Sequence, residues 1–129
     1  MIYVDSSVVL AQLLAEDRHP APAFWDQQPL VSSRLLEYEA WNRINARGLG
    51  ASHGEDLRRL LGRLAFLELV PPILGRALEP FPVRVRTVDA LHLASVEFLR
   101  SLAQRPSLAT YDRQLARAAD ALGIPAVSL

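Results

Sequence analysis

Four acidic side chains each lie just after a predicted strand or in an early turn of a predicted helix. Asp5 and Asp112 each follow a short apolar run that is typical of a buried strand. Glu39 lies in the second turn of a predicted helix, and Asp89 lies in the first turn of another. Ligands of parallel α/β sheets bind in the crevice beyond the carboxyl ends of the strands. Because those ends share one edge, we predict that the four carboxylates meet at one rim.

Asp89 is the most informative of these acids, because the helix that it begins is apolar nearly all round and is predicted to be buried. A carboxylate at the head of a buried helix needs a partner. The chain has no lysine, and its sequence indicates no obvious arginine for Asp89. Two carboxylates about 4 Å apart repel by roughly 4 kcal/mol at an effective dielectric constant near 20. A cation is the expected partner, and without it Asp5→Asn is expected to stabilise the fold.

The chemistry of the side chains indicates which cation to expect. The chain has no cysteine, and the acids are not accompanied by a pair of histidines. Oxygen ligands alone favour a hard divalent ion such as magnesium, for which manganese can substitute. Magnesium keeps several of its waters, and one of these can attack a phosphodiester. The residues therefore predict a metal-dependent phosphodiesterase site.

Composition limits the other possibilities. The 14 acidic and 14 basic residues balance, so net charge gives no general attraction to nucleic acid. All the basic residues are arginine, which excludes a Schiff-base lysine, a P-loop lysine and the lysine of a phospho-receiver site. No apolar run is long enough to span a bilayer, and the N-terminus lacks the features of a signal peptide. We expect one cytoplasmic domain over residues 1–129, without a membrane partner.

Strand and helix patterns alternate along the whole chain, as in an α/β fold with a parallel sheet covered on both faces. About five short strands and seven helices are expected. The predicted strands are residues 2–4, 30–32, 66–70, 108–109 and 125–129. The first predicted helix is capped by Ser6 or Ser7 and runs to about Glu16. The other predicted helices cover residues 22–27, 34–46, 53–65, 73–78, 88–102 and 115–122, with Ser33 and Thr87 as two of the N-caps.

Four segments of the chain resemble the PIN domain and, more narrowly, the VapC toxins of bacterial toxin–antitoxin pairs. The segment Arg-Thr-Val-Asp-Ala-Leu-His-Leu-Ala around Asp89 is quite specific, whereas the first-strand segment alone is weak. The resemblance covers essentially the whole chain. The four segments are residues 2–7, 32–39, 86–94 and 110–115.

The resemblance implies a three-layer α/β/α sandwich and a magnesium-dependent endoribonuclease. By position, Asp5, Glu39, Asp89 and Asp112 match the acidic quartet of the family. Asp5 and Asp89 are then expected as metal ligands, with Glu39 and Asp112 binding directly or through water. Family members usually dimerise and are blocked by a cognate VapB antitoxin, so the expected partners are RNA, a VapB-type antitoxin and a second copy of the chain.

The resemblance also implies a supporting set of hydroxyl groups. Thr110 matches one supporting position of the family, and one hydroxyl of Ser6 or Ser7 matches another. These side chains are expected to turn the chain after the first strand and to hold the Asp5 carboxylate in place.

Several residues keep a second interpretation. Taken singly, Asp5 and Asp112 are equally good helix caps, and Glu39 is an ordinary surface acid. Glu37 competes with Glu39, but the two are about 200° apart on a helix and the family spacing selects Glu39. His92, one turn after Asp89, is either a supporting group or, as we favour, a packing residue. Three aromatic residues are either RNA-stacking or core residues: Trp25, Trp41 and Phe24. Three arginines of one predicted helix either line the path of the RNA or form a solvated helix face: Arg34, Arg43 and Arg47.

Four functions compete at this point. The leading one is a metal-dependent ribonuclease toxin. A catalytically weak RNA-binding or partner-binding domain is the second, although all four acids are present. A phospho-receiver module is disfavoured by the lack of lysine. A nuclease of the same superfamily without a toxin role, including a DNA flap nuclease, is the fourth, although flap nucleases carry added helical elements.

Overall fold

A parallel four-stranded sheet forms the centre of the computed structural model, which describes residues 1–27 and 29–129. The strands are β1 (Ile2–Val4), β2 (Leu30–Ser33), β3 (Ala65–Leu67) and β4 (Ser107–Ala109). The helices are α1 (Ser6–Leu13), α2 (Leu35–Ala46), α3 (Gly50–Leu61), α4 (Pro71–Ala77), α5 (Thr87–Ser101) and α6 (Arg113–Ala121), with a 3-10 helix η1 at Pro22–Asp26. None of the helices in the described part is long and apolar enough to cross a membrane.

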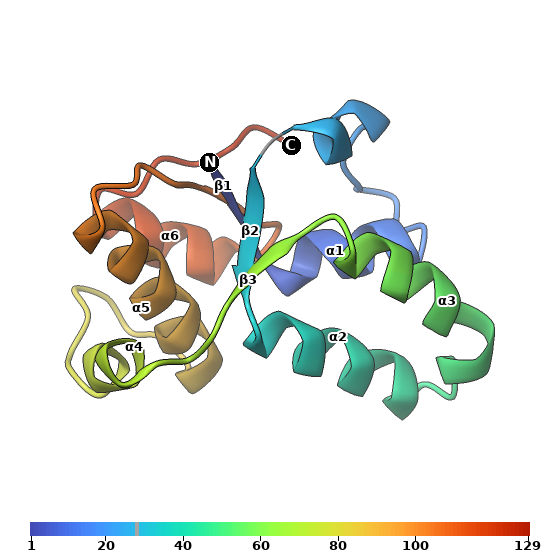
Figure 1. Cartoon of the computed structure of the whole chain (residues 1–129), viewed down its shortest axis with the longest axis horizontal. Helices are drawn as coiled ribbons and strands as arrows, with labels where there is room; N and C mark the ends of the chain where they lie inside the picture. Colours follow the sequence, from blue (N-terminus) through green and yellow to red (C-terminus); the bar gives the residue numbers. More distant parts are fainter. Residues whose placement is uncertain (28) are drawn as a thin grey trace.

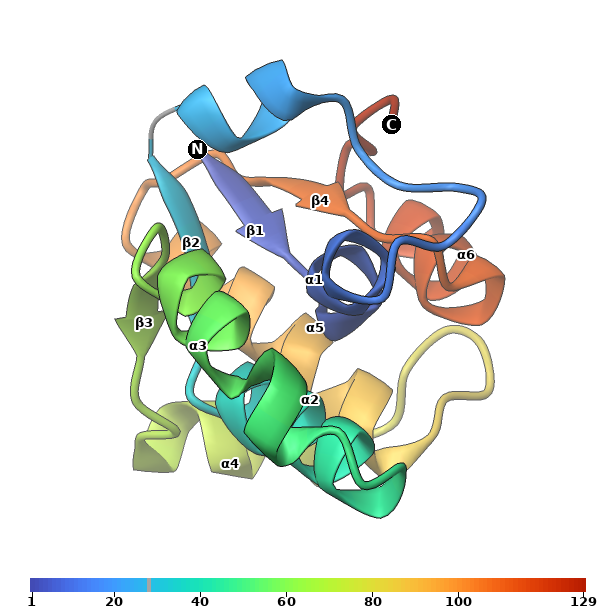
Figure 2. The same cartoon turned by 90° about the vertical axis from the view of Figure 1, so that its right-hand side faces the viewer.

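The helices form two layers around the sheet. Figure 1 views the sheet edge-on, with α1, α2 and α3 on one side and α4, α5 and α6 on the other, and Figure 2 shows the arrangement after a quarter turn. Successive strand residues point to opposite faces, so the sheet supplies two cores. Val4 packs into a core with α1, α2 and α3, whereas its neighbour Tyr3 packs into a core with α5 and α6. The molecule is therefore a three-layer α/β/α sandwich.

The order of the strands locates the functional edge of the sheet. The order of the strands is β3-β2-β1-β4. Strands β2 and β3 are added on one side of β1, and the chain then crosses back so that β4 lies on the other side of β1. Tyr3 pairs with Val31 of β2 and with Leu108 of β4. The strand order therefore reverses between β1 and β4. In doubly wound sheets the ligand crevice lies at this switch point, beyond the carboxyl ends of the two strands.

The predicted fold class is confirmed, and the differences lie in the details. Four strands form the sheet among the described residues, and the predicted fifth strand is reduced to an isolated parallel bridge between Leu108 and Ala126. The seven predicted helical segments are present in that part of the chain, as six α-helices and the 3-10 helix η1. The predicted strand 66–70 is shorter and ends at Leu67, because Pro71 and Pro72 begin α4 instead of following a strand.

Three predicted helix caps are wrong. Ser33 belongs to β2 and is fully buried, and Arg34 is the residue before α2. Thr87 is the first residue of α5 rather than its N-cap. Asp5, not Ser6 or Ser7, caps α1, because its carboxylate accepts a hydrogen bond from the Ser7 backbone N–H. As a result α1 and α5 begin earlier than predicted, at Ser6 and Thr87, whereas α2 begins one residue later, at Leu35.

Candidate active site

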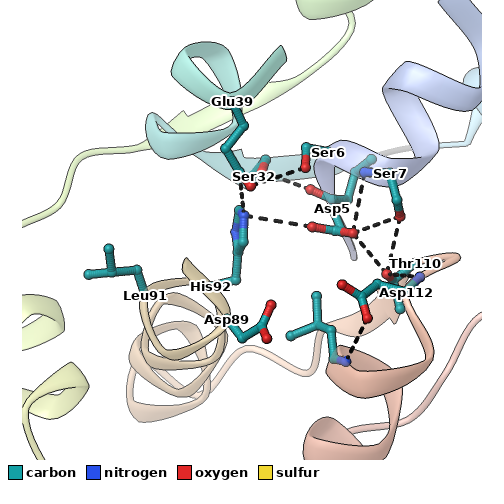
Figure 3. Close-up of polar contacts among 12 residues, drawn as sticks. Asp5, Ser6, Ser7, Ser32, Glu39, Asp89, Leu91, His92, Thr110 and Asp112 are labelled. Atoms are coloured by element: carbon teal, nitrogen blue, oxygen red, sulfur yellow. Dashed lines mark hydrogen bonds and ion pairs between the residues drawn. The ribbon is translucent and has the colours of Figure 1, made fainter. Parts of the chain in front are cut away.

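A cavity of about 700 Å³ opens at the switch point of the sheet. It is lined by all four predicted acids, which come from the end of β1, from α2, from the first turn of α5 and from the residue before α6. In Figure 3 the side chains of Asp5, Glu39, Asp89 and Asp112 point toward a shared region from these separate elements. The prediction that the acids meet at one rim therefore agrees with the structure, although their role as metal ligands stays a prediction.

Asp5 is fixed at the centre of the site. Its side chain is buried, and Oδ2 accepts hydrogen bonds from Ser7 Oγ at 2.7 Å, from Thr110 Oγ1 at 2.8 Å and from Ser7 N at 3.3 Å. Oδ1 is different: it accepts no hydrogen bond from the described residues and lies 3.7 Å from His92 Nε2. One oxygen thus anchors the side chain, and the other keeps its lone pairs available.

Glu39 is held from two sides. Its Oε1 contacts His92 Nε2 at 2.6 Å, and its Oε2 accepts a hydrogen bond from Ser6 Oγ at 3.2 Å. The other ring nitrogen of His92 contacts the Tyr3 hydroxyl at 2.8 Å. Burial lowers the pKa of His92, but Tyr3, Glu39 and Asp5 together outweigh burial and hold that pKa well above its usual value. A protonated His92 then donates to Glu39 and orients this carboxylate.

Arg86 pairs with two of the acids, which corrects the expectation that Asp89 has no arginine partner. Arg86 Nε donates to Asp89 Oδ2 at 3.2 Å, and Arg86 Nη2 donates to Asp112 Oδ2 at 2.7 Å. Asp89 also accepts a hydrogen bond from the Arg86 backbone N–H, as in a capping box. The pair was missed because Arg86 precedes the helix, where the direction of its side chain does not follow from helical spacing.

Asp112 has a second task. Its Oδ1 accepts hydrogen bonds from Gln114 N at 2.9 Å and Leu115 N at 3.2 Å, so it caps α6. The cap interpretation is therefore confirmed, and Asp112 also lines the cavity, while its role in the site stays a prediction. Asp112 turns one oxygen to the helix and the other to the cavity.

The supporting hydroxyls separate into two groups. Ser7 and Thr110 contact Asp5, as predicted, and also fix the chain after β4, since Ser7 Oγ accepts from Tyr111 N and Thr110 Oγ1 accepts from Asp112 N. Ser6 points to Glu39 instead of Asp5. The choice between Ser6 and Ser7 is thus resolved in favour of Ser7 for Asp5.

Of the residues with two interpretations, Glu37 contacts Arg34 and lies outside the cavity, whereas Arg43 lines it. Trp25 and Phe24 are buried in the core. His92 is buried as well, but it is not a simple packing residue, since both ring nitrogens have polar contacts. Its position one helical turn after Asp89, on the same face, was the signal available in the sequence.

The donor set fits a hard divalent cation. A carboxylate oxygen of Asp5, one of Glu39 and a ring nitrogen of His92 lie within 4.8 Å of one another. Because a protonated His92 has no free lone pair, the carboxylate oxygens are the candidate ligands. Asp5 Oδ1 accepts no hydrogen bond from the described residues, and the Asp5 side chain is 7% exposed. His92 supplies one positive charge at 3.7 Å, and a divalent cation in the cavity would neutralise more of the four carboxylates. Magnesium or manganese, bound through few carboxylates and several waters, matches such a partly open set.

The fold and this site define a class of protein. A family profile of the PIN domain matches residues 2–121. The chain belongs to the PIN domain family.

Individual relatives agree with this assignment. Ribonuclease VapC35 of Mycobacterium tuberculosis is 32% identical over 135 residues, an alignment that covers 99% of this chain and 96% of that protein. Ribonuclease VapC46 of the same organism is 31% identical over 129 residues, covering 98% and 96%. Ribonuclease VapC47 is 29% identical over 121 residues, covering 89% and 87%. The chain is thus similar to these ribonucleases along nearly its whole length.

Proposed function

We propose that this chain is a magnesium-dependent endoribonuclease, with manganese able to substitute, and that it is the toxin of a type II toxin–antitoxin pair. The observation that carries the chemistry is the convergence of Asp5, Glu39, Asp89 and Asp112 in one cavity at the switch point of a PIN domain. The similarity to three proteins named as ribonucleases supports RNA as the substrate.

The residues of the chain divide the work of phosphodiester cleavage. Asp5 Oδ1 faces the cavity as a ligand, while Ser7 and Thr110 keep that carboxylate from rotating. Glu39, oriented by His92 and Ser6, binds the cation directly or through water. A bound magnesium ion would lower the pKa of a coordinated water and neutralise charge on the phosphate.

RNA cleavage by the purified protein tests the chemistry. We expect cleavage with magnesium or manganese and none with EDTA. Asp89→Asn should slow cleavage on the order of 100-fold, because a metal ligand is lost. Asp120→Asn, an exposed position on α6, is the matched control and should cleave at the wild-type rate. If folded Asp89→Asn cleaves as fast as the wild type, the proposed site is wrong.

The toxin role needs a separate experiment. Expression of the chain in a bacterium should arrest growth, and co-expression of the reading frame that precedes it should restore growth if that frame encodes a VapB-type antitoxin. We propose further that the toxin acts in the cytoplasm as a homodimer. Growth arrest that persists in Asp89→Asn would contradict a ribonuclease toxin, and cleavage without arrest would indicate a PIN nuclease without a toxin role.

A further inference from the structure

Arg86 stands out among the cations near the cavity because it binds the acids themselves. Its guanidinium group reaches Asp112 Oδ2 at 2.7 Å and Asp89 through both carboxylate oxygens, at 3.2 and 3.4 Å. Arg43 also lines the cavity, but no ion pair joins it to the four acids in the part of the chain that the structure describes. One arginine therefore bridges half of the proposed metal site.

The two sides of this bridge differ in how firmly they are held. The Asp89 side chain is 3% exposed at the head of the buried helix α5, and Asp112 is tied to α6 by its cap hydrogen bonds. The Arg86 side chain is 63% exposed and leaves the last residue of an irregular segment. The exposed guanidinium keeps access to water when the pair opens, whereas the buried Asp89 carboxylate stays in place and needs another positive partner. The guanidinium is thus the partner that can move while the carboxylates stay.

A cation and Arg86 compete for the same oxygens. Both Asp89 oxygens and Asp112 Oδ2 accept from the guanidinium. A cation bound through Asp89 or Asp112 is repelled by this positive charge, which favours opening of part of the bridge. An arginine released at the rim of the cavity stays within reach of whatever phosphate lies there. Its planar fork of donors matches phosphate oxygens in a bidentate fashion, which a lysine does not reproduce.

We propose that Arg86 is an exchangeable counter-ion and the phosphate-binding residue of this site. It neutralises Asp89 and Asp112 until a divalent cation takes these carboxylates, and it then binds a phosphate of the RNA strand. The inference rests on the proposed metal-dependent ribonuclease function. The simpler alternative is a purely structural role, in which Arg86 holds the segment before α5 against the edge of the cavity.

Manganese affinity separates the two roles without any cleavage. Manganese is titrated calorimetrically into the wild type, Arg86→Ala and Arg86→Lys. The affinity should rise about three- to tenfold in Arg86→Ala, because the guanidinium no longer competes for the Asp89 and Asp112 oxygens. Arg86→Lys should lie between the two. Arg84→Ala is the control, since Arg84 is exposed on the same segment and lies outside the acid cavity.

RNA cleavage kinetics test the second half of the proposal. With saturating manganese, Arg86→Ala should raise KM about tenfold or more while kcat changes much less, and Arg86→Lys should recover only part of the loss. A purely structural role of Arg86 predicts the opposite pattern for Arg86→Ala, with lower manganese affinity, a lower melting temperature and a lower kcat. Unchanged manganese affinity or an unchanged KM in Arg86→Ala refutes the proposal.

The outcomes also distinguish this inference from the proposed function. If the wild-type chain binds no manganese, the metal site itself is refuted, and both proposals fall. If the wild type binds manganese and cleaves RNA while Arg86→Ala behaves identically, only the role of Arg86 is refuted.

Discussion

At the scale of single residues, Asp5 combines a structural oxygen with a functional one. Oδ2 accepts three hydrogen bonds, and Oδ1 lies 3.7 Å from His92 Nε2. Repulsion between the acids alone predicts that Asp5→Asn stabilises the metal-free protein, but these hydrogen bonds predict the opposite. Asp5→Asn should lower the melting temperature of the protein in EDTA, because an amide is a weaker acceptor for these donors. A higher melting temperature would indicate that repulsion within the cluster dominates.

The two serines after β1 provide a matched comparison. Ser7→Ala removes a donor to the buried Asp5 carboxylate and leaves Tyr111 N without its acceptor. We expect a loss of about 2 kcal/mol in the free energy of unfolding, measured by urea denaturation. Ser6→Ala removes one longer hydrogen bond to Glu39 and should cost clearly less. Equal losses in the two variants would contradict the separate roles of the hydroxyls.

His92 predicts a pH dependence for the protein in EDTA. Its pKa is raised in the folded state, so the native chain binds a proton more tightly than the unfolded chain. The resulting stabilisation is fully present below the unfolded pKa of about 6.5 and is lost as pH rises through the folded value. Urea denaturation from pH 6 upward should therefore show falling stability that is absent in His92→Gln. Stability that rises over this window in the wild type would contradict a raised pKa.

At the scale of elements, the acids of the site also form the junctions between strands and helices. Asp5 links β1 to α1, and Asp112 links β4 to α6, each as an N-cap. Because the carboxyl ends of β1 and β4 are adjacent, the two caps face the same cavity. The cap fixes the position of a carboxylate relative to the sheet, which is what a preorganised site requires.

Two substitutions of Asp112 separate its two tasks. Asp112→Asn keeps an oxygen for the α6 cap and should leave the stability nearly unchanged, while it weakens manganese binding. Asp112→Ala loses the cap as well and should cost about 1 kcal/mol more, measured by urea denaturation. If both variants lose the same stability, the hydrogen bonds to Gln114 N and Leu115 N contribute nothing to the helix.

At the scale of the whole molecule, the sequence predicted the α/β class because strand and helix patterns alternate, and the structure confirms the parallel sheet between two helical layers. The placement of the four acids also followed, since each lies just after a strand or in an early turn of a helix. The contacts of Arg86 and His92 did not follow. They depend on which way a side chain leaves an irregular segment and on cross-layer packing with Tyr3, and neither is encoded in local spacing.

The prediction of a strand at residues 125–129 was wrong for a related reason. Residues near Ala126 have the composition of a strand, but a strand also needs a partner along its length, and only Leu108 pairs there among the described residues. Pairing partners are a property of the assembled sheet, so local propensity overestimates a terminal strand.

The manganese affinity of four single variants tests the central claim most directly. Asp5→Asn, Glu39→Gln, Asp89→Asn and Asp112→Asn should each weaken manganese binding about tenfold or more, measured by calorimetry, whereas Asp120→Asn should bind as the wild type does. That pattern is expected only if acids from four separate elements form one metal site. Wild-type affinity in all four folded variants would contradict it.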